Sequence, residues 1–388
     1  MRTKIGWGSS RTTHLTIAIV FLALFSVGCA HVSAPPAAST VSTSAHASST
    51  SAASDTQHAG QFSVDNIQAD YVYTSELITV LYPLYGSKLD DFIVVTLNNK
   101  NSTPAKVLVE SEIVGYTDKA SDTVDLKPGQ TLEVRQNPLL IPKVIDDLNV
   151  EKPAQVHIHV AALQEGVEKE ILDQTEQTTV YARRDFPWSI KGFTETEVFQ
   201  FLAAMVTPND PAVEELIRKA ADHTDSGIMW NGYGDHVNDD NGGVWDRLQA
   251  LWQAENEYNL TYVSTWVSLA PGDVQRIRFP AEVLEQQSGN CIELALLYAS
   301  AAEALDLEAD LILIPGHAFV GIREDQENAN YYFIETTMIG HASFDDAVTK
   351  AGDEFDDALP HISAGDASYG WVKIWDARDA GIQPLPWR

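Results

Sequence analysis

The stretch "QQSGNCIELALLYASAA", residues 286–302, places Cys291 where a glycine-bearing loop meets an apolar run. Asn290 is a residue type that favours the helix N-cap, and Glu293, three residues later, completes the pattern of a capping box. Apolar residues then recur at helical spacing at Leu294, Leu297, Tyr298, Ala301 and Leu305. The pattern predicts a helix that begins at Cys291 and buries this stripe.

A cysteine at the start of a helix has a distinctive chemistry. The unpaired backbone N–H groups of the first turn and the helix dipole stabilise a thiolate, and the same groups stabilise an oxyanion. Gly289 lets the chain approach closely and is expected to leave the sulfur open to a substrate. Cys291 is therefore a candidate nucleophile. The alternative is an inert buried cysteine, which is common.

A candidate base and a candidate acid follow the helix. The sequence predicts three antiparallel strands, over 310–314, 317–322 and 331–335. Folding the second hairpin about its middle sets His317 opposite Glu335 or Thr336, where opposed Cβ atoms lie about 5 Å apart. A carboxylate at that distance reaches an imidazole nitrogen and fixes its tautomer. The predicted arrangement is that of nucleophile, base and orienter in acyl transfer.

These segments, "SGNCIELAL", "PGHAFVGI" and "YYFIETT", resemble the core of the transglutaminase-like superfamily. The resemblance is strong over residues 270–340 and weak over 185–388. It implies a papain-like α+β fold, in which a helix bearing the cysteine packs on an antiparallel sheet bearing the histidine and the acid. The β-rich region before residue 184 lies outside the resemblance.

The resemblance implies roles for individual residues. Cys291 matches the nucleophile of the family's G-x-C-x-[DE] stretch, and His317 matches the histidine of G-H-A-[FW]-V. Glu335 stands where the family usually has Asp in a D-P-T segment, so the acid here is longer by one methylene. Gln275 is a candidate oxyanion-hole donor, because papain-like enzymes use a glutamine there; a surface polar residue is the alternative.

The region before this core is predicted to be a separate domain. Short β-branched runs separated by turn signals over residues 61–183 predict an immunoglobulin-like β-sandwich, followed by the catalytic domain at 184–388. His157 and His159 alternate on one strand, and a solvated strand face is expected because no third metal ligand is evident. The sequence contains neither C-x-x-C nor H-E-x-x-H, so neither a metal nor a cofactor is expected.

The N-terminus has the pattern of an export signal. Residues 1–29 combine a basic start with the apolar run "HLTIAIVFLALFSVG" and end at Cys29, as in a bacterial lipobox. Ser26 stands where a lipobox usually has Leu, and ordinary cleavage after Ala30 is the alternative. Residues 30–60 are rich in Ser, Ala and Thr and predict a disordered tether. We expect an exported protein of the bacterial cell envelope, anchored to a membrane as a lipoprotein.

Composition excludes one class of partner. The chain has 388 residues with a net charge of -30 and a pI of about 4.5, and no basic patch stands out. Nucleic-acid binding requires Lys and Arg to meet the phosphates, so nucleic acid is not expected as a partner. The hydrophobic content of 44% is enough for a buried core.

Taken together, these patterns predict a cysteine-dependent enzyme that forms a thioester at Cys291 and hydrolyses a peptide or isopeptide amide of a peptide or protein substrate. One alternative is amine transfer to protein glutamine, as in a transglutaminase proper. Another is a non-catalytic binding or scaffold protein with a vestigial triad. Thiol reactivity separates the enzyme from the scaffold, and the sequence does not indicate an oligomeric state.

Overall fold

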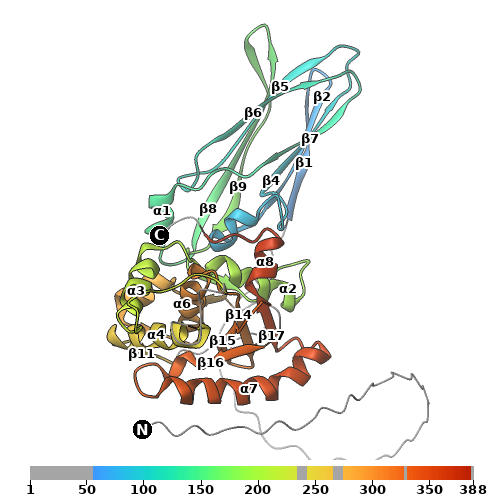
Figure 1. Cartoon of the computed structure of the whole chain (residues 1–388). Coiled ribbons are helices and arrows are strands. Elements are labelled where there is room, and N and C mark those ends of the chain that lie inside the picture. Colours follow the sequence, from blue (N-terminus) through green and yellow to red (C-terminus); the bar gives the residue numbers. More distant parts are fainter. Residues whose placement is uncertain (1–55, 234–242, 265–273, 327–329, 386–388) are drawn as a thin grey trace, which may run out of the picture. The chain divides into compact units, whose positions relative to one another are not determined.

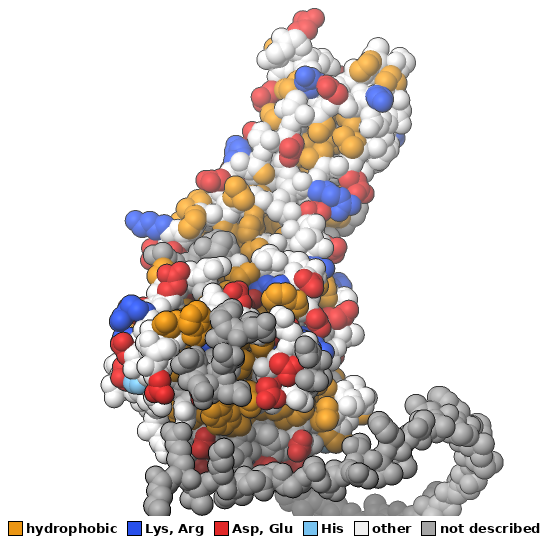
Figure 2. Space-filling view, in the orientation of Figure 1, with side chains coloured by type: hydrophobic (Ala, Val, Ile, Leu, Met, Phe, Trp, Pro, Cys, Tyr) orange, Lys and Arg blue, Asp and Glu red, His pale blue; other side chains and the backbone are white. Residues whose placement is uncertain are grey.

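A computed structural model describes residues 56–233, 243–264, 274–326 and 330–385. The predicted signal peptide, Cys29 and residues 30–55 of the predicted linker lie outside this part of the chain. Within it, no helix combines the length and the apolar character that crossing a bilayer requires. Asp and Glu side chains are scattered over the face of the molecule that Figure 2 shows.

Two sheets form the N-terminal part of the described chain (Figure 1). The first has the order β1 (Thr56–Val64), β2 (Ile67–Thr74), β4 (Ile93–Asn99) and β7 (Thr131–Gln136). The second has the order β3 (Glu76–Leu77), β9 (Val167–Val180), β8 (Lys152–Gln164), β5 (Ala105–Ile113) and β6 (Ala120–Leu126). All neighbours are antiparallel except β3 and β9, which are parallel. Strand β1 begins inside the stretch predicted as linker.

The two sheets pack face to face as a sandwich. Buried and partly exposed residues alternate along β2, β4 and β5, so each strand turns one row of apolar side chains inward. Polar side chains also join the sheets. The Tyr71 hydroxyl of β2 donates to Glu176 of β9 at 2.6 Å, and the Ser111 hydroxyl of β5 donates to Gln136 of β7 at 2.5 Å. Short helices η1 (Thr79–Leu84) and α1 (Pro142–Asp146) lie between the strands in sequence.

The C-terminal part mixes helices with small sheets. Its four-stranded antiparallel sheet has the order β16 (Tyr331–Ile334), β15 (His317–Arg323), β14 (Ala309–Ile314) and β17 (Gly370–Lys373). Helix α6 (Cys291–Ala304) packs against β14 and β15, and α7 (Phe344–Ala364) packs against β16. The other elements are α2 (Glu195–Gln200), η2 (Phe201–Met205), α3 (Pro211–Ala221), α4 (Val244–Glu257), α5 (Pro280–Gln286), η3 (Thr336–Met338) and α8 (Ile374–Asp379), with the short strands β10 (Asp185–Pro187), β11 (Thr261–Tyr262), β12 (Val274–Arg276) and β13 (Ser288–Gly289).

The predicted α+β class is confirmed, with two differences in detail. Helix α6 begins at Cys291 as predicted, but every residue from Cys291 to Ala302 is buried rather than a single stripe. A helix that is apolar all round is buried all round, which makes α6 the central helix of this part. The second difference is β17, a fourth strand that pairs with β14 and that the sequence did not reveal.

Candidate active site

The start of α6 holds Cys291 in a fixed backbone environment. The Asn290 side chain accepts from the Glu293 N–H at 3.0 Å, and the Glu293 carboxylate accepts from the Asn290 N–H at 2.9 Å. The predicted capping box is therefore confirmed. Cys291 is a free thiol and only 2% exposed.

Glu293 also anchors the chain that precedes α5. Arg278 donates to it from Nε at 3.0 Å, from Nη2 at 2.6 Å and from its backbone N–H at 2.9 Å. These hydrogen bonds raise the pKa of Arg278. At Gly289 a Cβ would lie 2.9 Å from the Leu294 side chain, so the close approach that glycine allows is to the core. The expectation that the sulfur is left open is wrong, because Cys291 is buried.

His317 opens β15 immediately after the turn that follows β14. Its Nε2 atom lies 2.5 Å from Glu335 Oε2, and the Cys291 side chain interacts with the same ring. Burial opposes the charged imidazolium, but the hydrogen bonds to Cys291 and Glu335 outweigh burial and raise the pKa of His317 to about 10. The structure therefore brings Cys291, His317 and Glu335 together.

Glu335 reaches His317 by a route that the sequence reasoning did not foresee. The ladder between β15 and β16 ends at the pair Val320 and Ile334, so Glu335 does not face His317 across the sheet. Glu335 instead caps η3, and its Oε1 atom accepts from the Thr337 N–H at 3.0 Å. The cap turns the second carboxylate oxygen toward the imidazole.

Glu354 of α7 is a fourth member of the site that sequence reasoning missed. Its Oε2 atom lies 3.8 Å from His317 Nε2, and its Oε1 atom lies 2.7 Å from Lys350 Nζ. Burial and a hydrogen bond to Glu335 hold the pKa of Glu354 above its usual value. Although burial also opposes the charge of Glu335, its hydrogen bond to His317 and the imidazolium charge hold its pKa below the usual value. The only sequence signal was the i,i+4 spacing of Lys350 and Glu354, which is ordinary on a helix.

Gln275 lies on β12, opposite Phe186 of β10. Its Oε1 atom accepts from Trp188 Nε1 at 3.1 Å, and its buried Nε2 group has no hydrogen-bond partner in the described part of the chain. The side chain thus offers a free donor but makes no hydrogen bond with Cys291 or His317. Its role in an oxyanion hole stays a prediction.

The geometry of the cluster of His317, Glu335 and Glu354 suits a shared hydrogen bond better than a bound metal ion. One ligand atom from each of His317, Glu335 and Glu354 lies within 4.8 Å of the others. Zinc bonds of about 2.0–2.2 Å at a tetrahedral angle hold two ligand atoms about 3.4 Å apart. The 2.5 Å between His317 Nε2 and Glu335 Oε2 is too short for two ligands of one zinc ion and indicates a short, direct hydrogen bond between the two side chains.

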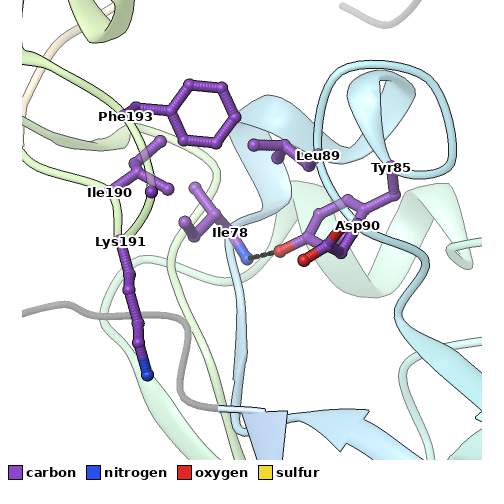
Figure 3. A pocket seen from close by; sticks show the side chains of 8 residues that line it. Ile78, Tyr85, Leu89, Asp90, Ile190, Lys191 and Phe193 are labelled. Atoms are coloured by element: carbon purple, nitrogen blue, oxygen red, sulfur yellow. Dashed lines mark hydrogen bonds between the residues drawn. The ribbon is translucent and has the colours of Figure 1, made fainter.

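A separate pocket of about 220 Å³ lies elsewhere in the chain (Figure 3). It is lined by Ile78, Tyr85, Leu89, Asp90, Ile190, Lys191, Gly192 and Phe193. None of the predicted catalytic residues lines it, so the pocket is not part of the site at α6.

Comparison with known proteins supports the resemblance of the region around Cys291 to the transglutaminase-like superfamily. Residues 278–350 match the family model described as the transglutaminase-like superfamily. The matched segment includes Cys291, His317 and Glu335, and it confirms the resemblance there. The match suggests cysteine-dependent acyl transfer as the general class of chemistry. No curated protein shows significant similarity to the chain.

Two solved structures resemble parts of the chain only loosely. A FixG-related protein from Vibrio parahaemolyticus is 12% identical with a TM-score of 0.20, and the match covers 31% of this chain and 99% of that one. A protein from Archaeoglobus fulgidus is 8% identical with a TM-score of 0.18, covering 33% of this chain and 94% of that one.

Proposed function

We propose that the chain is an exported, membrane-tethered cysteine enzyme that forms a thioester at Cys291 and hydrolyses a peptide or isopeptide amide. One observation carries the proposal. A single imidazole, that of His317, is hydrogen-bonded to a buried carboxylate and also interacts with a thiol at a helix N-terminus. Structural histidines rarely need both partners, whereas a base that must be held in one tautomer does.

The acylation step uses the two ring nitrogens of His317 differently. Glu335 engages Nε2, which leaves Nδ1 for the Cys291 sulfur. The thiolate attacks the amide carbon, a C–S bond forms, and the N–H groups at the start of α6 that the capping box does not use receive the oxyanion. The imidazolium then gives its proton to the leaving nitrogen as the C–N bond breaks, and a thioester remains on Cys291.

Deacylation reverses the proton's path. His317, now neutral, takes a proton from water, and the resulting hydroxide attacks the thioester carbon. The C–S bond breaks, the acid product leaves, and the thiolate–imidazolium pair is restored. In this scheme Glu354, whose pKa is raised by burial, donates a hydrogen bond to Glu335 when it is protonated, which leaves the negative charge on the carboxylate that faces His317.

The test is the rate of Cys291 alkylation by iodoacetamide as a function of pH, in the parent chain and in His317→Ala. The proposal requires fast alkylation well below the free-thiol pKa of about 8.5, and its loss in the variant. An ordinary thiol profile that His317→Ala leaves unchanged would contradict the enzyme and favour the scaffold alternative. If the couple is present, incorporation of a labelled amine into a glutamine peptide separates transfer from hydrolysis.

The N-terminal sandwich is proposed to be immunoglobulin-like. If β2, β4 and β7 are strands A, B and E, then β5, β8 and β9 are strands C, F and G in chain order. The sheet neighbours β2-β4-β7 and β9-β8-β5 then match the A-B-E and G-F-C orders of that fold. Such a domain would position the enzyme or its substrate, and lipidation of Cys29 would hold both at a membrane.

A further inference from the structure

The outer face of the sheet β3-β9-β8-β5-β6 carries a row of polar side chains. His157 and His159 project from this face of β8, because the intervening Ile158 is fully buried. The strand register sets Asp173 of β9 directly opposite His159. Opposed side chains of an antiparallel pair are close enough to share a ligand.

A β-bulge brings another carboxylate to the same place. Leu172 of β9 pairs with Val160, but Glu170 pairs with Ala161, so Ile171 is an extra residue. Both Ile171 and Leu172 are buried, at 6% and 2% exposure. Regular alternation from Asp173 would turn residue 170 inward. The bulge instead returns Glu170 to the outer face, beside Asp173.

The distances suit a metal ion. One ligand atom from each of His159, Glu170 and Asp173 lies within 4.8 Å of the others. Asp173 Oδ2 is 3.8 Å from His159 Nδ1, close to the roughly 3.4 Å between two ligands of a tetrahedral zinc ion. The other oxygen, Asp173 Oδ1, lies 2.7 Å from His157 Nε2. Hydrogen bonds of this kind orient the carboxylates that bind metals.

The charge of the cluster is not balanced by the protein. Among the described residues, no Lys or Arg forms an ion pair with Asp173, Glu170 or Glu168. Glu168 lies 3.8 Å from the far ring nitrogen of His159, where a carboxylate supports a metal-binding imidazole. A divalent cation would offset the carboxylates that surround the two imidazoles.

We propose that this face binds one divalent transition-metal ion of the zinc class through His159, Asp173 and Glu170, with His157 orienting Asp173. An imidazole combined with carboxylates favours zinc over magnesium or calcium, which prefer oxygen ligands alone. Three protein ligands leave a coordination position for water or for a group of another molecule. The site is independent of the proposed catalytic function, because none of its residues touches Cys291 or His317.

The test is isothermal titration of the metal-stripped full chain with Zn²⁺. Every sample, including the parent, carries His317→Ala, which removes the imidazole from the cluster of His317, Glu335 and Glu354. The expected result is one Zn²⁺ per chain, with affinity reduced at least tenfold by His159→Ala and by Asp173→Asn, and about tenfold by His157→Ala. Zn²⁺ should also raise the unfolding temperature of the parent and not that of Asp173→Asn.

The matched control is His361→Ala, because His361 is an exposed histidine paired with one acid, Asp366, at 3.3 Å. This variant should bind Zn²⁺ like the parent. Glu170→Gln provides a third ligand variant at an exposed position where folding is not at risk. An absence of binding in the parent, or affinities that His159→Ala, Asp173→Asn and Glu170→Gln leave unchanged, would overturn the proposal.

Discussion

The charge of Glu335 should set the protonation state of His317, and Glu335→Gln tests this. Gln has nearly the same shape but no charge. The Glu335 side chain is 4% exposed and that of His317 is 21% exposed, so an effective dielectric constant of about 20 applies. With the two charges about 4 Å apart, their attraction is about 4 kcal/mol. At 1.36 kcal/mol per pKa unit, its loss lowers the pKa of His317 by about 3 units.

Histidine ring NMR as a function of pH measures this shift directly. In the parent, the imidazolium of His317 should persist to a pH of about 10. In Glu335→Gln its midpoint should fall to about 7, by the electrostatic loss above. Amide hydrolysis by the variant should then decline above neutral pH, because the leaving nitrogen no longer receives a proton, while the parent stays active.

The raised pKa of His317 also makes the stability of the fold depend on pH. The pKa of His317 is raised above its unfolded value of about 6.5. Its contribution to stability is therefore complete below pH 6.5 and is lost as the pH rises toward about 10. Glu335→Gln should flatten this decline. If His317 of the parent titrates near 6.5, or if its pKa moves by less than one unit in the variant, the electrostatic reasoning is refuted.

Four further predictions concern other positions. Glu354→Gln can still donate a hydrogen bond to the neighbouring carboxylate and should change kcat little, whereas Glu354→Leu removes that hydrogen bond and should lower kcat about tenfold in an amide-hydrolysis assay, the equivalent of about 1.5 kcal/mol. Glu255 is fully buried, its carboxylate has no hydrogen-bond partner in the described chain, and burial raises its pKa well above the usual value. Folding should therefore weaken as the pH rises above about 4.3, and Glu255→Leu should add about 1–3 kcal/mol at pH 8 in urea unfolding. Glu293→Ala removes both a helix cap and the partner of Arg278 and should cost about 3 kcal/mol in the same assay. Cys29→Ser should move the protein out of the membrane fraction and remove any lipid mass from the N-terminal peptide.

Local signals carried most of what the sequence revealed about the site. Residues adjacent in sequence determine three features: the cap at Asn290, the turn at Pro315-Gly316 and the β-rich hairpin. The start of α6 and strands β14, β15 and β16 could therefore be predicted to within a residue or so. The family pattern linked Cys291 to His317. Strand β17 could not be found because "GWVK" is too short to alternate, and only its pairing with β14 makes it a strand.

Non-local contacts account for what was missed. Glu354 reaches His317 from α7, and no periodicity connects residues 37 positions apart in sequence. The cluster of His159, Glu170 and Asp173, which we propose as a metal site, was missed for a similar reason. His157 and His159 were visible in the sequence as an alternating pair. Asp173 and Glu170 come from the neighbouring strand β9, and Glu170 reaches the same face only through a bulge that alternation does not predict.

The residues of the proposed triad all lie at the ends of secondary-structure elements. Cys291 is the first residue of α6, His317 is the first residue of β15, and Glu335 is the N-cap of η3. At such ends the backbone leaves N–H groups unpaired, so the fold supplies donors for an oxyanion and for a carboxylate without adding polar side chains to the core. Ordering these groups loses conformational entropy, which the burial of the helix and the sheet behind them offsets. Asn290→Ala, which removes the cap at the start of α6, should therefore lower the alkylation rate of Cys291 while costing only about 1 kcal/mol of stability in urea unfolding.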